Sequence, residues 1–409
     1  MQTIIHKSLK KHPAINEADK ILRSCVHCGF CNATCPTYQL LGDELDGPRG
    51  RIYLMKQMIE TGESSSETLS HLDRCLTCRN CETTCPSGVH YGRLLGIGRE
   101  LAEKNSPRKP TDILIRWLLR QIIPYKKRIG LIIKLAIKLK AILPKSIQRQ
   151  LPEDLHNDVQ LERHQRIVIL PTGCAQGAFA PDINADCRTI LDKLGITAIE
   201  IDADTCCGAM SEHMAQTDEA HRFIKQNINA WWPSIEAGAE AVISTASACG
   251  LMIKDYAELL KNDPDYAVKA ARISSLCVDI SEYLSQQDLS LLDKNKTGRI
   301  SFHSPCTLQH GQGITGQVEK LLRQVGYDLI DYNDAHLCCG SAGAYSILQK
   351  SISKKLLTNK LDNLLHNQPD AIATANIGCL LHMRSGTSTP VVHWLQLLNS
   401  NAQLDSNID

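Results

Sequence analysis

The run Cys25-Val26-His27-Cys28-Gly29-Phe30-Cys31-Asn32-Ala33-Thr34-Cys35-Pro36 decides the fold of the first part of the chain. It returns once, as Cys75-Leu76-Thr77-Cys78-Arg79-Asn80-Cys81-Glu82-Thr83-Thr84-Cys85-Pro86. In both copies three cysteines are spaced by two residues, and a fourth follows and directly precedes a proline. Proline has no backbone N–H and a fixed φ, so it turns the chain away from the loop. Each run therefore offers three thiols on one tight loop and a fourth directed elsewhere.

This spacing is the known signature of bacterial 4Fe–4S ferredoxins. In two-cluster ferredoxins the fourth cysteine of each run binds the other cluster. On that resemblance we assign the eight cysteines to two clusters. The first set is Cys25, Cys28, Cys31 and Cys85, and the second is Cys75, Cys78, Cys81 and Cys35. A zinc site or a disulfide set is the alternative, but zinc sites usually combine paired C-x-x-C units.

Composition narrows the class of protein. A chain of 409 residues, 43% of them hydrophobic, is long enough for two to four domains with buried cores. The net charge of +1 argues against nucleic-acid binding, and 4 Trp and 4 Phe provide no aromatic groove for single strands. The 18 cysteines, eight of them in runs that need reduced thiolates, predict a reducing compartment. We expect neither a signal peptide nor a membrane span, since no sufficiently long apolar run occurs.

The two runs are predicted to form one helical, ferredoxin-type domain, residues 1–100. Between them, Gly and Pro residues predict a loop over Gly42–Arg51, and apolar residues at helical spacing predict a helix over Ile52–Ile59. A helical insert at this place resembles the iron–sulfur subunits of succinate and fumarate dehydrogenases. Arg49 and Arg51 have two interpretations, as positive charge beside anionic clusters or as a solvated loop edge.

Residues 101–160 are predicted to form a basic amphipathic helical connector. Apolar residues recur at helical spacing over Ile113–Pro124 and Leu131–Lys140, and no acidic residue occurs over Ile113–Leu151. Such helices lie on an anionic membrane surface or dock a partner. Alternatively, they pack the two halves of the chain together, with Lys and Arg merely solvated. The polar stretch 151–160 is expected to be a linker.

From Ile167 onward, short apolar runs alternate with helical stretches. The strand candidates are Ile167–Leu170, Ala241–Ser244, Arg299–Phe302 and Ile372–Ala375. Alternating strands and helices indicate parallel, doubly wound sheets. The predicted fold class is therefore α/β with an α-helical N-terminal domain.

This second half repeats itself in its cysteines. The first set is Cys174, Cys206, Cys207 and Cys249, and the second is Cys306, Cys338, Cys339 and Cys379. The offsets are 306 − 174 = 132, 338 − 206 = 132 and 379 − 249 = 130. We predict a duplicated α/β unit, residues 161–295 and 296–409, with its thiols at strand ends. Adjacent cysteines rarely close a disulfide with each other but can present two sulfurs to a metal or redox site.

The repeated pattern resembles the CCG domain of heterodisulfide reductase and its relatives. In its full form that motif ends in C-x-x-C, whereas Ala246 stands three residues before Cys249 and Asn376 three before Cys379. Each unit thus offers four cysteines instead of five. The sequence leaves open a four-thiolate cluster, a substrate thiol site or a relic.

Two cysteines and two histidines remain outside these motifs. Cys187 and Cys277 lie in apolar contexts and are predicted to be core residues. His303 and His310 flank Cys306, where either could tune or ligate a site. A hydrogen-bonding role in the loop is the simpler interpretation.

The order of these parts, over essentially the whole chain, resembles the iron–sulfur subunits of glycolate oxidase (glycolate dehydrogenase). The resemblance implies an electron-transfer subunit with two 4Fe–4S clusters and, as an open alternative, further clusters in the CCG domains. It also implies a partner subunit that oxidises glycolate to glyoxylate at FAD, and a quinone or other acceptor. The expected location is cytoplasmic, with peripheral contact to the inner face of the cytoplasmic membrane as an alternative.

No catalytic residue is predicted in this chain itself. A G-x-G-x-x-G after a strand is absent from the sequence, so we expect the flavin in another polypeptide. Similar subunits occur with lactate-utilisation enzymes and anaerobic glycerol-3-phosphate dehydrogenase, which are alternatives for the substrate. A thiol–disulfide reductase like heterodisulfide reductase is the alternative enzyme class.

Overall fold

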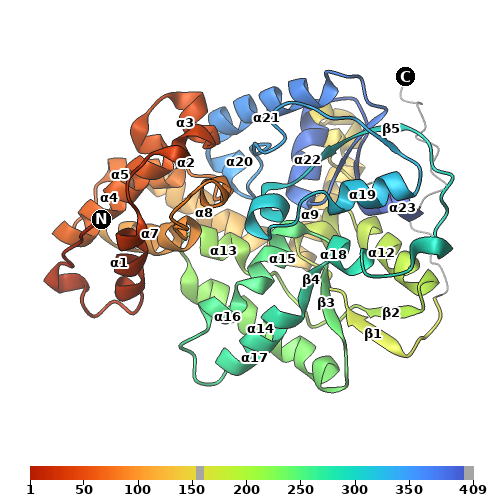
Figure 1. Ribbon diagram of the computed structural model, residues 1–409, viewed down its shortest axis with the longest axis horizontal. Coiled ribbons are helices and arrows are strands. Elements are labelled where there is room, and N and C mark those ends of the chain that lie inside the picture. The colour runs from red at the N-terminus through yellow and green to blue at the C-terminus, as the bar shows by residue number, and fades with distance from the viewer. Residues whose placement is uncertain (153–160, 400–409) are drawn as a thin grey trace.

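The computed structural model describes residues 1–152 and 161–399. Most of the linker predicted at 151–160, and residues 400–409 of the second unit, lie outside this described part. The N-terminal domain, red and orange in Figure 1, is helical and has no strand among its described residues. Its helices are α1 (Ile15–Ser24), α2 (Phe30–Ala33), α3 (Pro36–Leu41), α4 (Pro48–Thr61), α5 (Ser66–Asp73), α6 (Asn80–Thr83) and α7 (Tyr91–Asn105).

Helix α4 confirms the helix predicted at Ile52–Ile59 and extends it. It begins at Pro48, so the loop predicted over Gly42–Arg51 is wrong for its last residues. Proline is favourable in the first turn of a helix, where its missing N–H is not needed. The helix ends at Thr61 and is capped by Gly62, whose φ of 76° is left-handed and suits glycine.

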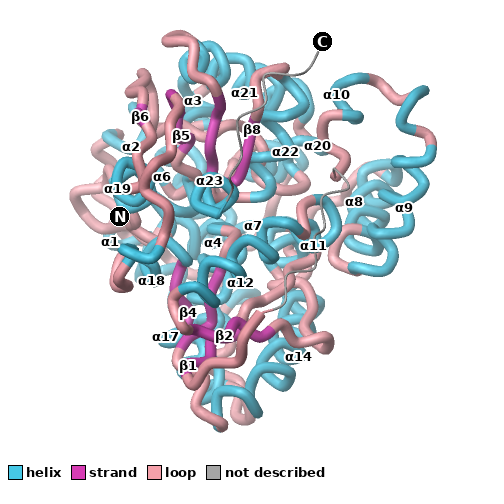
Figure 2. The backbone as a smooth tube through the Cα atoms, turned by 90° about the vertical axis from the view of Figure 1, so that its right-hand side faces the viewer, coloured by secondary structure: helices cyan, strands magenta, loops and turns pink. Residues whose placement is uncertain are grey.

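The connector forms α8 (Pro110–Ile122), α9 (Lys126–Lys138) and α10 (Lys145–Gln148). The two predicted amphipathic helices are confirmed, and they stand out at one side of the molecule in Figure 2. Their polar side chains bridge the two halves, because Arg116 pairs with Asp73 at 2.8 Å and Arg120 pairs with Glu219. No helix in residues 1–152 and 161–399 is long and apolar enough to cross a bilayer.

Two four-stranded parallel sheets make up the second half. The first has the order β2-β1-β3-β4 and the second the order β6-β5-β7-β8, so each repeat has the same topology. This confirms the α/β class and the duplication. The strands are β1 (Arg166–Ile169), β2 (Ile196–Ile199), β3 (Ala241–Ser244), β4 (Cys277–Asp279), β5 (Arg299–His303), β6 (Asp328–Leu329), β7 (Ala371–Thr374) and β8 (Val391–His393).

The four predicted strands are the two central strands of each sheet, β1, β3, β5 and β7. The structure adds the outer strands β2, β4, β6 and β8, which the sequence analysis missed. All four residues of β3 and of β7 are buried, so these strands appear as continuous apolar runs. The outer strands are shorter or half-exposed and carry a weaker signal.

Helices surround both sheets, which lie one above the other in Figure 2. Apolar residues of the two units, such as Ile243 and Phe302, belong to one continuous core. Cys187 and Cys277 are buried in the cores of the first unit, as predicted. The helices are α11 (Ala175–Phe179), α12 (Asp182–Lys193), α13 (Ala209–His213), α14 (Thr217–Glu236), α15 (Ser247–Lys254), α16 (Tyr256–Leu259), α17 (Ala267–Leu276), α18 (Ile280–Leu284), α19 (Gln317–Gln324), α20 (Tyr345–Leu348), α21 (Lys350–Leu365), α22 (Ile377–Gly386) and α23 (Trp394–Asn399).

Candidate iron–sulfur sites

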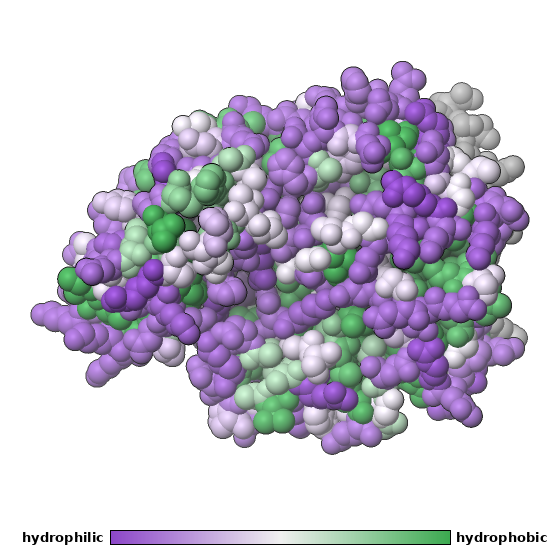
Figure 3. Space-filling model, viewed as in Figure 1, coloured by the Kyte–Doolittle hydropathy of each residue, from purple (hydrophilic) through white to green (hydrophobic). Residues whose placement is uncertain are grey.

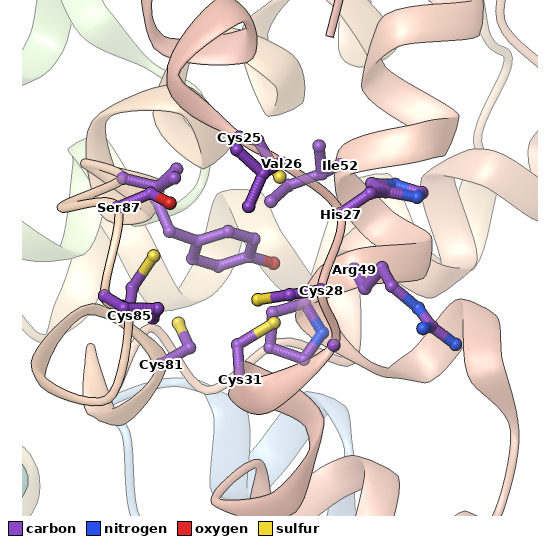
Figure 4. Close-up of a pocket in the computed structure, with 15 residues that line it drawn as sticks. Cys25, Val26, His27, Cys28, Cys31, Arg49, Ile52, Cys81, Cys85 and Ser87 are labelled. Carbon is purple, nitrogen blue, oxygen red and sulfur yellow. The ribbon is translucent and has the colours of Figure 1, made fainter.

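A small cavity brings together cysteines of both runs. It is lined by Cys25, Cys28, Cys31 and Cys85, and also by Cys81, and its volume is about 30 Å³. In Figure 4 the thiols of Cys28, Cys31 and Cys85 face a common space. Burial, and then the neighbouring Cys25, raise the pKa of Cys31 to about 11. A set of thiols with no carboxylate in the lining is the donor set that soft metals prefer.

The remaining cysteines form a second group. Cys35, from the first run, lies within electrostatic range of Cys78 and Cys81 of the second run, and Cys75 joins them. Burial raises the pKa of the Cys78 thiol and that of the Cys81 thiol well above the ordinary value of a cysteine. The fourth cysteine of each run therefore lies with the other run, which is the grouping that crossed ligation would need.

Arg51 places a buried positive charge beside the second group. It is fully buried and donates to the Thr37 hydroxyl at 3.2 Å, which lies 3.3 Å from the Cys35 sulfur. Burial disfavours the charge, but Cys75 and other neighbours hold the pKa of Arg51 above its usual value. The solvated-edge interpretation is wrong for Arg51, whereas the Arg49 side chain is 37% exposed.

The second run also packs against the second CCG unit, an arrangement that the sequence analysis missed. Leu76 and Cys78 pack in one apolar cluster with Cys338. The Tyr345 hydroxyl donates to the Arg74 carbonyl at 3.0 Å. In Figure 1, α3 of the N-terminal domain lies beside α21, in agreement with their contacts. The second cysteine group thus lies next to the thiols of the second unit.

The four repeated cysteines of the first CCG unit meet at the ends of β1 and β3. The sulfurs of Cys174 and Cys206 are 3.6 Å apart. Hydrogen bonds from Cys206 and Cys249 hold the pKa of Cys207 below its ordinary value, and bonding to its thiol neighbours raises that of Cys206. Since a chain of bonds runs from Cys174 through Cys206 and Cys207 to Cys249, this unit presents one four-thiol site.

The second CCG unit has the same arrangement, with a histidine added. The sulfurs of Cys306 and Cys338 are 3.9 Å apart, and one ring nitrogen of His303 lies within 4.8 Å of the sulfurs of Cys339 and Cys379.

The two histidines that flank Cys306 differ in their hydrogen bonding. His310 meets the predicted hydrogen-bonding role, because its ring lies 2.9 Å from the His336 carbonyl. For His303 that role is wrong, since neither ring nitrogen has a partner among the described residues.

A larger cavity, of about 740 Å³, separates the N-terminal domain from the first CCG unit. Thr77 and Arg79, on either side of Cys78, line it, as do Glu212 and His213 from α13. Burial raises the pKa of Glu212, and its Oε2 has no hydrogen-bond partner among the described residues. No pattern in the sequence indicates this cavity, because its walls come from distant segments of the chain.

The connector helices carry exposed apolar side chains. The exposed fractions of Trp117 and Leu131 are 48% and 69%, and the further members of this set are Ile113, Leu114, Ile115, Leu118, Ile132 and Leu135. We call this set the connector face. On the face of the molecule drawn in Figure 3, by contrast, hydrophobic residues lie scattered among hydrophilic ones. An apolar surface of this extent on helices that also carry many lysines and arginines is suited to docking.

Family models match three segments of the chain. Residues 21–89 match a 4Fe-4S dicluster domain, and residues 168–254 and 300–384 each match a cysteine-rich domain. These segments contain the two cysteine runs and the two sets of repeated cysteines. The iron–sulfur character predicted from the spacing is confirmed at the level of the domain.

Two curated relatives match nearly the whole chain, and a third matches about half of it. The glycolate oxidase iron-sulfur subunit of Escherichia coli is 46% identical over 97% of this chain and 98% of its own length. The probable glycolate oxidase iron-sulfur subunit of Bacillus subtilis is 32% identical, over 89% of each chain. Lactate utilization protein A of Oceanobacillus iheyensis is 26% identical over 56% of this chain and 95% of its own length.

The fold also occurs among solved structures. A hypothetical protein from Helicobacter pylori superposes with a TM-score of 0.56 at 12% identity, covering 97% of this chain and 72% of the other. At this level of identity the likeness concerns the fold alone.

Proposed function

This chain belongs to the family of glycolate oxidase iron–sulfur subunits, and we propose that it conducts electrons from a partner subunit to a quinone. The partner would hold FAD and oxidise glycolate to glyoxylate, with the loss of two electrons and two protons. The catalytic residues would therefore lie in the partner, and this chain would act as the electron conduit of the enzyme.

The crossed grouping of the two cysteine runs is the observation that supports this proposal most strongly. We propose that Cys25, Cys28, Cys31 and Cys85 bind one 4Fe–4S cluster, and that Cys75, Cys78, Cys81 and Cys35 bind the other. When bound, such clusters supply one-electron carriers. The protein would hold them close together, since the Thr34 and Thr84 hydroxyls, one from each run, are 3.1 Å apart.

We further propose that the quinone binds in the 740 Å³ cavity beside the second run. A quinone takes up two electrons and two protons, so its site needs both a nearby electron carrier and an acid. Thr77 and Arg79 bring the cavity to the loop of Cys78, and Glu212 is a buried acid whose pKa is raised by burial. Quinone reduction should accordingly depend on Glu212 more strongly than reduction of a one-electron dye.

The connector face would bring the chain to the membrane in which quinones dissolve. Exposed apolar side chains such as Leu131 and Leu135 lie on a helix that also carries Lys134 and Lys138. Basic amphipathic helices bind anionic lipid surfaces by this combination. We therefore propose a cytoplasmic protein attached peripherally to the inner face of the membrane.

Reconstitution with the flavin-containing partner tests the function. The pair should oxidise glycolate with a quinone analogue as acceptor, and neither subunit should do so alone. Replacing Glu212 by Gln should lower quinone reduction at least tenfold and leave reduction of ferricyanide by the pair unchanged. Oxidation of glycolate by the partner with unaltered quinone reduction in the absence of this chain would refute the conduit role.

A further inference from the structure

His303 is a polar side chain in an unusual setting. It is the last residue of β5, it is fully buried, and both ring nitrogens lack a hydrogen-bond partner among the described residues. Burying an imidazole without any hydrogen-bond partner is energetically unfavourable. Such a cost is expected where the ring binds a ligand.

Two thiols lie in front of His303, and a third thiol is bonded to one of them. A ring nitrogen of His303 and the sulfurs of Cys339 and Cys379 all lie within 4.8 Å of one another. Cys338 is hydrogen-bonded to Cys339 and adds a further thiol to the group. Ligand atoms around one tetrahedral metal, with bonds of about 2.0–2.3 Å, are roughly 3.5–3.8 Å apart. These side chains can therefore reach one metal with small adjustments.

The position of His303 also explains a departure of this unit from the full CCG motif. Asn376 stands where the motif has a cysteine, and its amide nitrogen lies 3.7 Å from the Cys379 sulfur. Position 376 thus borders the same thiols that His303 faces. An imidazole can take the place of the missing thiolate, because both are good ligands for zinc and iron.

The first unit lacks this histidine. The offset between the units is 306 − 174 = 132, and 303 − 132 = 171, so Pro171 occupies the equivalent position. The cavity at that site is lined by Cys174, Cys207 and Cys249, and by no imidazole within the described residues. The two copies therefore offer different ligand sets despite their common fold.

We propose that the second CCG unit binds a zinc or iron centre through His303, Cys338, Cys339 and Cys379, with the imidazole in place of the cysteine missing at position 376. The inference goes beyond the electron-transfer function and rests only on metal binding by the second set of thiols. Cys306 lies behind Cys338, at 3.9 Å between sulfurs, and so borders the centre without being needed as a ligand.

The charges around the site suit such a centre. Three thiolates and one divalent metal leave a net charge of −1, and Lys360 supplies a compensating cation. Lys360 is 2% exposed, donates to the Asp334 carbonyl at 2.7 Å and lies within electrostatic range of His303 and Cys339. The positive charge of Lys360 can therefore balance a negatively charged metal centre at this buried site.

Metal analysis of the full-length protein, purified without oxygen, tests the proposal. Iron, zinc and sulfide per chain are measured for the wild type, His303→Ala, and the matched control His310→Ala. We expect His303→Ala to lose one zinc, or up to about four irons, while His310→Ala loses none. Adding Asn376→Cys to His303→Ala should restore the metal. Loss of zinc or of iron identifies the metal, and either supports the proposal.

X-ray absorption of the wild type keeps the test independent of variant folding. The spectrum of the metal beyond the two ferredoxin-type clusters should show nitrogen as well as sulfur ligands. An all-sulfur spectrum, no metal beyond those two clusters, or unchanged metal in His303→Ala would overturn the proposal. None of these readouts depends on glycolate oxidation, so failure of the conduit role would be recognised separately.

Discussion

Asn80 donates from its side-chain amide to the carbonyl oxygen of His336 at 3.2 Å, which joins the second cysteine run to the second CCG unit. The same amide donates to the Thr34 carbonyl of the first run at 3.0 Å. Asn80 is 2% exposed and lies between Cys78 and Cys81. One side chain therefore connects three cysteine-bearing segments that are far apart in sequence.

Replacing Asn80 by Ala should loosen this junction. Two buried hydrogen bonds are lost and two carbonyl groups lose a donor, so we expect the free energy of unfolding to fall by roughly 2–3 kcal/mol. Thermal unfolding followed by circular dichroism measures the change. Thr83→Val is the control, because the Thr83 hydroxyl contacts His310 at the exposed edge of the same junction and otherwise donates to the Asn80 carbonyl, which also accepts from Thr84. Equal stability of the two variants would show that Asn80 does not hold the junction.

Removal of the Arg51 charge should lower the reduction potential of the second cluster. A nearby cation stabilises the more negative, reduced state, so Arg51→Gln is expected to shift the potential by roughly −60 mV, about 1.4 kcal/mol for one electron. A redox titration followed by electron paramagnetic resonance measures it. Arg49→Gln, at the solvated edge, should leave this potential nearly unchanged. A shift of the same size in both variants would contradict the special position of Arg51.

If each run supplies its fourth cysteine to the other cluster, the iron lost by a double variant depends on which two cysteines are replaced. Cys28→Ala and Cys85→Ala should each remove about four irons per chain, and their combination should remove no more than either alone. Combining Cys28→Ala with Cys35→Ala should remove about eight, because those residues are assigned to different clusters. Iron analysis of protein purified without oxygen distinguishes a loss of about four irons from a loss of about eight. If the first pair loses about eight irons, the two runs do not exchange their fourth cysteines.

The connector face should determine membrane binding. Leu131 and Leu135 are 69% and 58% exposed, and replacing both by Glu puts negative charge on an apolar face that meets anionic lipid. We expect at least tenfold weaker cosedimentation with phosphatidylglycerol vesicles. Val268→Glu, at an 82% exposed position of α17, is the control and should bind normally. Unaltered binding of the double variant would exclude the connector face as the membrane contact.

Asp186 should make stability depend on pH. Burial raises its pKa from 3.8 to about 6. A carboxyl with a raised folded-state pKa favours folding in its protonated form, and this contribution is lost as the pH rises through about 6. Asp186→Asn, which stays neutral, should therefore increase the free energy of unfolding at pH 8 by roughly 1–2 kcal/mol.

Denaturant unfolding at several pH values checks this expectation. The difference between Asp186→Asn and the wild type should shrink as the pH falls from 8 towards 5. Asp328→Asn, at a side chain that is 74% exposed, should show no such trend. A difference independent of pH would mean that burial does not raise the pKa of Asp186.

Most of the architecture could be predicted from local patterns. The spacing within each cysteine run requires only a tight loop, and the offset of 306 − 174 = 132 identifies the duplicated unit before any contact is known. The central strands β3 and β7 are buried on both faces and so appear as apolar runs. The outer strand β6, two residues long, leaves no such pattern.

The sequence by itself determined which cysteines are available and on which loops, since spacing along the chain fixes local geometry. Only the tertiary structure decided what lies beside them. Arg51 approaches Cys35 because α4 is buried against the loops, and His303 faces Cys379 because β5 and β7 are neighbours. Burial and long-range contact depend on how distant segments pack, and residue spacing alone does not record that packing.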